Sequence, residues 1–112
     1  MGLGVSPRTA DRGATPYDYE TVAASQTAQV LGATGSIGDY IEGVLVIPAV
    51  VAGGLVTLLD GSTSIPLYVG GATSTLVDVK PFYIKLGMKS VSGPWKITTG
   101  ASISVIAMGD FT

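Results

Sequence analysis

The chain has 112 residues, of which 46% are hydrophobic and only 12% are charged, and it contains neither His nor Cys. Without imidazole or thiol no side chain has an unperturbed pKa near neutrality, and disulfides and the usual zinc ligands are excluded. Six basic and eight acidic residues give a net charge of −2 without a basic run, which argues against direct nucleic-acid binding. The composition predicts one domain with no enzymatic activity and no cofactor, whose sparsely charged surface is covered by partners.

Residues 1–20 differ in composition from the rest of the chain. They hold two prolines, two arginines and three acids, with almost no periodic apolar residues. Such a segment cannot bury enough apolar surface to offset its ordering entropy, so we expect an extended arm that becomes ordered on a partner. The residues expected to make this contact are Pro7, Arg8, Arg12, Pro16, Tyr17 and Tyr19.

From residue 21 onward, short apolar runs alternate with glycine-rich breaks at intervals of roughly ten residues. This rhythm predicts an all-β domain over residues 21–112, an antiparallel β-sandwich of jelly-roll-like form. The expected strands are residues 21–31, 40–48, 55–59, 64–69, 76–86 (as one strand or two), 95–99 and 102–108. Pro81 is expected to bend or interrupt the fifth run, and Gly87 to end it.

The run of residues 44–47 is apolar at four consecutive positions. In an antiparallel sheet, a strand that is apolar on both faces is covered on one face by the core and on the other by another chain or layer. Pro48 cannot donate to a strand ladder and belongs at an edge or a bulge. We therefore predict a subunit interface at Val44, Val46 and Pro48.

Residues 30–38 (VLGATGSIG) resemble the glycine-rich fingerprint of extended short-chain dehydrogenases and other NAD(P)-binding families. That fingerprint requires a helix after its last glycine. Here Gly43 interrupts, a β-branched run begins at Val44, and Pro48 follows, so a helix is not expected. The motif is predicted to be a loop between two strands and to bind no cofactor.

Residues 43–59 carry no charge over seventeen positions, which is close to the length of a membrane span. Pro48 and the pair Gly53-Gly54 would interrupt such a helix, and no Lys or Arg flanks it closely. A hairpin of two buried strands explains the same residues, so no membrane segment is expected.

Asp39 and Glu42 are expected to be solvated turn or rim residues, and Asp60 to be a turn residue. Ser and Thr are abundant, but no His or well-placed Lys is available to activate one as a nucleophile. Trp95 is expected to pack in the core, with an aromatic platform for a sugar as the alternative.

Three passages carry a resemblance to a known group of proteins: residues 38–48 (GDYIEGVLVIP), 80–84 (KPFYI) and 104–110 (SVIAMGD). With the arm and the glycine-rich sandwich, they resemble the small head-decoration, or cement, proteins of tailed bacteriophages and related minor virion proteins. The resemblance covers residues 20–112 and implies a trimeric β-rich cap at threefold or quasi-threefold positions of the capsid, with the arm across neighbouring capsid subunits.

The resemblance implies a non-enzymatic virion protein, assembled in the host cytoplasm, that decorates and stabilises the capsid. Its expected partners are copies of itself in a homotrimer and the major capsid protein. The alternative is a carbohydrate- or receptor-binding sandwich of a tail fibre or spike.

Overall fold

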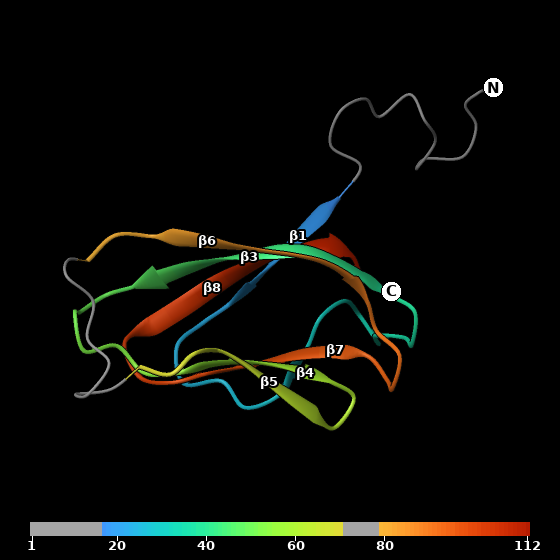
Figure 1. Ribbon diagram of the computed structural model, residues 1–112, viewed down its shortest axis with the longest axis horizontal. Helices are drawn as coiled ribbons and strands as arrows, with labels where there is room; N and C mark the ends of the chain where they lie inside the picture. The colour runs from blue at the N-terminus through green and yellow to red at the C-terminus, as the bar shows by residue number, and fades with distance from the viewer. Residues whose placement is uncertain (1–16, 71–78) are drawn as a thin grey trace.

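The fold consists of two β-sheets that lie face to face (Figure 1). The computed structural model describes residues 17–70 and 79–112, and these residues form eight strands and no helix. The strands are β1 (Asp18–Val22), β2 (Gln29–Val30), β3 (Tyr40–Pro48), β4 (Val56–Asp60), β5 (Thr63–Tyr68), β6 (Phe82–Lys89), β7 (Trp95–Thr99) and β8 (Ile103–Asp110). The first sheet has the order β1-β8-β3-β6 and the second the order β2-β7-β4-β5, with all neighbours antiparallel. The predicted all-β sandwich is confirmed.

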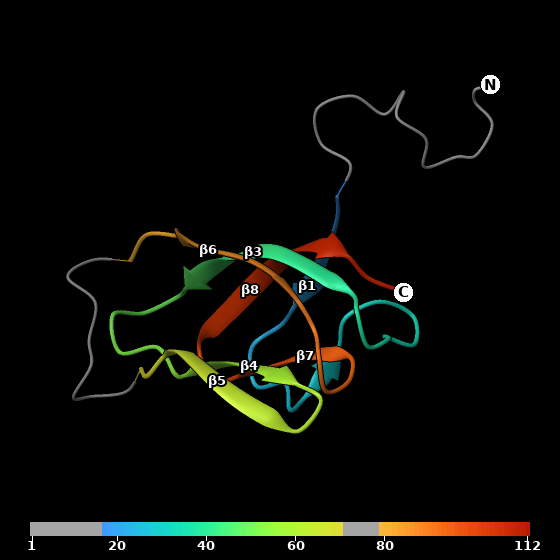
Figure 2. The same cartoon turned by 45° about the vertical axis from the view of Figure 1, so that its right-hand side comes forward.

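Figure 2 shows the two sheets facing each other from a second side. The core lies between them and is built from alternate residues of their strands. In β7, for example, Trp95, Ile97 and Thr99 are buried while Lys96 and Thr98 between them are half-buried. The largest fully buried side chains are Trp95, Leu31, Ile41, Leu58, Ile97, Ile103, Val22, Val44, Val46, Val56 and Val105. Burying this apolar surface is the main force that holds the two sheets together.

The predicted strand over residues 21–31 is wrong in one respect, because it is two strands in different sheets. β1 ends at Val22 in the first sheet and β2 begins at Gln29 in the second. The connection is fixed by hydrogen bonds from Ser25 N to Gly100 O and from Thr99 Oγ1 to Ala23 O. In addition, β1 starts at residue 18, so residues 18–20 belong to the sandwich and not to the arm.

The predicted strand over residues 76–86 also differs from β6, which begins after Pro81 and continues through Gly87 to residue 89. Gly87 lies within the strand and does not end it. Its φ of 64° is a left-handed conformation that costs glycine little. The register between β3 and β6 shifts after Ile41, which marks a β-bulge at this point. Residues 71–78 lie outside the described residues.

The glycine-rich motif is a loop, as predicted, and β3 starts two residues after its last glycine. The loop is fastened to the carboxyl end of the chain: Thr34 N and Gly35 N donate to Thr112 O. Asp39 Oδ2 in turn accepts from Ser36 N and Thr112 N. Asp39 is therefore a buried structural residue and not the solvated one that the sequence suggested.

Asp60 holds together two loops at the end of the second sheet. It ends β4 beside a hairpin turn, but its side chain is only 6% exposed and points toward residues 91–93. Its carboxylate accepts hydrogen bonds from the backbone N–H groups of Val91, Ser92 and Gly93. Burial alone would raise the pKa of Asp60, but the three N–H donors outweigh it and lower the pKa.

Replacing Asp60 by Ala should destabilise the protein by about 1–3 kcal/mol at neutral pH, because three backbone donors lose a charged acceptor. Since the pKa is lowered on folding, this contribution is complete above the ordinary value of 3.8 and disappears as the pH falls through the lower folded value. Urea denaturation at neutral and acid pH measures both effects. Asp60→Asn keeps an acceptor without the charge, so its stability at neutral pH should lie between that of the wild type and that of Asp60→Ala. An equal cost of Asp60→Ala at both pH values would contradict the role of the carboxylate.

Candidate interaction surface

The first sheet has an apolar centre on its outer face, the name we give to the side turned away from the second sheet. Residues opposite one another in antiparallel strands project to the same side of the sheet. The register places Leu45 of β3 between Ile106 of β8 and Tyr83 of β6. Met108, two residues after Ile106 in β8 and on the same side of the sheet, lies opposite Tyr19 of β1. Leu45, Ile106 and Met108 are half-buried, and no other strand of the described chain covers them.

Tyrosines surround this apolar centre. Tyr19 is 72% exposed on β1, and Tyr83 is exposed on β6 at the opposite edge of the sheet. Tyr17, the first residue that the structure describes, packs against Tyr40 with ring centroids 5.4 Å apart and a tilt of 34°. Tyrosine is enriched at protein interfaces because its ring offers apolar area and its hydroxyl a polar contact. The outer face therefore has the composition of a surface that binds protein.

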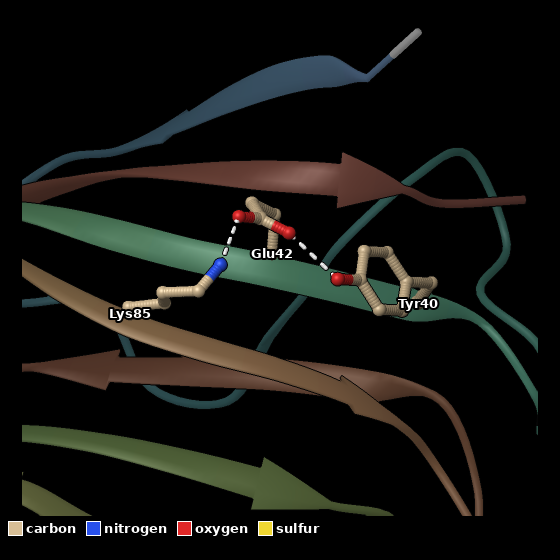
Figure 3. Close-up of polar contacts among 3 residues, drawn as sticks. All are labelled: Tyr40, Glu42 and Lys85. Atoms are coloured by element: carbon tan, nitrogen blue, oxygen red, sulfur yellow. Dashed lines mark hydrogen bonds and ion pairs between the residues drawn. The ribbon is translucent and has the colours of Figure 1, made fainter. Parts of the chain in front are cut away.

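Three polar side chains are joined across β3 and β6 at one end of the outer face (Figure 3). The Tyr40 hydroxyl donates a hydrogen bond of 2.6 Å to Glu42 Oε1. The Lys85 ammonium forms an ion pair of 2.6 Å with Glu42 Oε2. Both oxygens of Glu42 are thus engaged, so Glu42 is not the solvated rim residue that the sequence suggested.

The three groups shift one another's pKa values. The hydrogen bond to Glu42, followed by burial and the charge of Glu42, raises the pKa of Tyr40 above its ordinary range. The bonds from Lys85 and then Tyr40 lower the pKa of Glu42, although desolvation opposes this. The hydrogen bond and charge of Glu42 raise the pKa of Lys85. At neutral pH the cluster therefore holds a neutral phenol, a carboxylate and an ammonium group.

Gly43 leaves room for the side chain of Tyr83. It lies at the β-bulge directly after Glu42, opposite Met108 and Lys85. A Cβ atom at this position would collide with the Tyr83 hydroxyl and with Ile84 O at 2.6 Å. The absence of a side chain at residue 43 thus lets the ring of Tyr83 lie across β3.

The second sheet presents a different surface on its outward side. Its register places Thr57 opposite Thr98, and Leu59 opposite Lys96 and Ser64. The same register adds Val30 opposite Lys96 and Pro66 opposite Thr57, so apolar and polar side chains are mixed on this side. The two outward sides of the sandwich therefore differ chiefly in the tyrosines, which lie on the first sheet.

The predicted subunit interface at Val44, Val46 and Pro48 is wrong. Val44 and Val46 are 0% exposed within a single copy, and Pro48 is also buried. Val44 and Val46 face the second sheet and form part of the core. The residues of β3 on the outer face are the alternate ones, Leu45 and Ile47, which the structure leaves half-buried.

The predicted arm residues divide into two groups. Tyr17 and Tyr19 lie on or beside the outer face, as described above. The others, Pro7, Arg8, Arg12 and Pro16, lie outside the described residues.

Trp95 belongs to the core, as the first of its two interpretations predicted. It is 1% exposed, and its indole N–H donates a hydrogen bond of 2.8 Å to Asp39 O. A sugar cannot stack on a ring that is enclosed in this way, so the aromatic platform at Trp95 is excluded. Of the other aromatic residues, Phe82 and Phe111 pack against the core, whereas Tyr83 is exposed.

Glu42→Gln should lower the pKa of Tyr40 toward its ordinary value of 10.0, because the hydrogen bond to the carboxylate is the largest cause of its rise. Absorbance titration of the phenolate, with Tyr40→Phe to assign the Tyr40 signal, measures this shift. Asp110→Asn is the matched control, since Asp110 is a second carboxylate opposite Tyr40 in the register. It should leave the titration of Tyr40 unchanged, and an equal effect of both variants would contradict the assignment.

Neither a cavity nor a group of three metal-ligating side chains is present in residues 17–70 and 79–112. Within the same residues no helix is long and apolar enough to cross a membrane. No family model, curated protein or solved structure was found to match the chain.

Proposed function

We propose that this protein is a non-enzymatic structural subunit of a phage virion, which decorates and stabilises the capsid by binding to it through the outer face. The observation that carries the proposal is the inequality of the two sheets. The first sheet gathers tyrosines around Leu45, Ile106 and Met108, while the outward side of the second mixes apolar and polar residues without an aromatic one. Tyrosine beside large apolar residues is typical of surfaces that bind protein.

The position of Tyr17 supports a joint role for the outer face and the arm. Its ring packs on Tyr40, at the same end of the outer face as the Glu42–Lys85 pair. The chain that precedes it therefore starts from the surface proposed to bind capsid. In this proposal Pro7, Arg8, Arg12 and Pro16 extend the contact onto neighbouring capsid subunits.

The sandwich is further proposed to be a jelly roll, in which a long hairpin of eight strands folds onto itself. Such folding pairs β1 with β8, β2 with β7, β3 with β6 and β4 with β5. Each of these four pairs is hydrogen-bonded in the chain. Viral capsid proteins and lectins are among the proteins built on this fold, which agrees with a virion role.

The stabilising effect in this proposal is mechanical. Copies of the protein, associated as a homotrimer, would bridge several capsid subunits at once. Each contact is weak alone, but linked contacts raise the effective concentration of the remaining ones, so that they must all break together for the shell to open.

Co-sedimentation with capsids that lack this protein tests the proposal. The purified chain should bind to them in a saturable manner, and the decorated capsids should withstand heating better than bare ones. Binding to isolated tails with none to capsids would contradict the proposal and favour the receptor-binding alternative.

A further inference from the structure

Strand β6 is the longest strand at an edge of either sheet. Four strands lie at sheet edges, and β6 has eight residues, whereas β2 has two. β5 carries Pro66, which lacks a backbone donor. The edge of β1 is approached by Gln29, whose amide donates to Thr21 O and Glu20 Oε2. In the described chain β6 pairs with β3 alone, so its other side offers backbone groups to an added strand.

The inward side chains beside this edge are incompletely covered. Those of β6 alternate with exposed residues and are half-buried, and so are those of β5, the edge strand of the second sheet. Tyr68 of β5 and Phe82 of β6 meet edge to face with centroids 5.8 Å apart, but the two strands belong to different sheets. The partly exposed apolar residues on this rim of the core are Ile65, Leu67, Phe82, Ile84, Leu86 and Met88.

The charge of β6 decides which strand fits it. Lys85 and Lys89 are exposed on its outward side, and β6 contains no acid. Pairing of β6 with β6 of a second copy would bring four lysines to one edge, of which Glu42 neutralises only Lys85 in each copy, and the remaining like charges repel across strands. An uncharged strand with apolar residues on one side avoids this repulsion and covers the rim.

Residues 1–6 have this pattern and no charged side chain. Met1, Leu3 and Val5 alternate with Gly2, Gly4 and Ser6, so an extended conformation places large apolar side chains on one side and small ones on the other. Pro7 follows and ends the run of backbone donors. Of the edge strands that the structure describes, β5 carries a proline and β6 two lysines, so neither has this pattern.

The connection to Tyr17 is long enough to reach beyond its own sheet. Tyr17 packs on Tyr40, which lies opposite Lys89 of β6 in the register. The ten residues from 7 to 16 span up to about 33–36 Å when extended. Neighbouring strands are roughly 4.8 Å apart, so this reach exceeds the width of the sheet.

We propose that residues 1–6 add as a strand to β6 of a neighbouring copy, with Met1, Leu3 and Val5 covering the rim of its core. The main-chain bonds would give the association its strength, and the alternation of large and small residues its register. The inference rests on the homotrimer of the proposed function, for which it supplies the contact between copies.

Light scattering on the full chain and two variants tests the inference. The full chain should have the mass of a homotrimer, three times the 11.3 kDa of one copy. Leu3→Asp places a charge against the apolar rim and should reduce the mass to that of one copy. Ser6→Asp, the matched control on the opposite side of the added strand, should retain the mass of the full chain. Because both substitutions lie outside the sandwich, circular dichroism should be unchanged in each.

A monomeric full chain, an associated Leu3→Asp variant, or equal dissociation of both variants would each overturn the inference. Capsid co-sedimentation separates this failure from failure of the proposed function. If the wild-type chain binds capsids while Leu3→Asp leaves its mass unchanged, the virion role stands and the strand addition does not.

Discussion

Trp95→Ala should destabilise the protein by about 3–5 kcal/mol, the loss typical of removing a large buried aromatic side chain. Trp95 is 1% exposed at the start of β7, where it packs between the sheets. Its indole N–H also fixes Asp39 O, just before β3 begins. The total stability of a small domain is about 5–15 kcal/mol, so this substitution removes a large share of it. Urea denaturation of the purified variant measures the loss.

Trp95→Phe separates packing from hydrogen bonding. It keeps a ring in the core but removes the indole donor, so it should cost less than Trp95→Ala. Asp39 O retains a second donor, Ser90 N at 2.9 Å, which limits the penalty of losing the indole. A loss below about 1 kcal/mol for Trp95→Ala would contradict the buried position of the ring.

Leu45→Asp should weaken binding to capsids by at least about tenfold, equivalent to about 1.4 kcal/mol. Leu45 lies in the middle of the outer face between Ile106 and Tyr83. A carboxylate there would lose most of its hydration on binding, a cost that one hydrogen bond from the Tyr83 hydroxyl would not offset. Co-sedimentation at several protein concentrations measures the change in affinity.

Leu59→Asp is the matched control for this prediction. Leu59 is likewise a half-buried leucine within a strand, but it lies on the outward side of the second sheet, opposite Lys96 and Ser64. Both variants should fold, because neither side chain is fully buried. Equal loss of binding in the two variants would show that the outer face has no special role.

The sequence was sufficient to predict the strands best defined by their own residues. The bounds of β3 and β7 agree with the predicted runs because proline, glycine and alternating residues mark their ends. The direction in which β3 faces was not predictable, since residues 44–47 are apolar at every position. Only the packing of the second sheet decides that Val44 and Val46 are inside and Leu45 outside.

Other features depend on contacts between distant residues. Glu42 and Lys85 meet only because β3 pairs with β6 in one particular register, with a bulge after Ile41. Asp60 is a plausible turn residue by type, but its partners at residues 91–93 belong to another loop. No local pattern indicates either contact. The connection after Val22 likewise changes sheet for a tertiary reason, because Ser25 and Ala23 are hydrogen-bonded to Gly100 and to Thr99 at the end of β7.

Electron cryo-microscopy of virions assembled with and without the protein tests the virion role most directly. We predict density that depends on the protein at repeated positions over the whole capsid, with Tyr19, Leu45 and Ile106 turned toward the shell and the second sheet turned toward solvent. Density confined to the tail, or a sandwich seated on the capsid with Leu45 and Ile106 exposed to solvent, would contradict it.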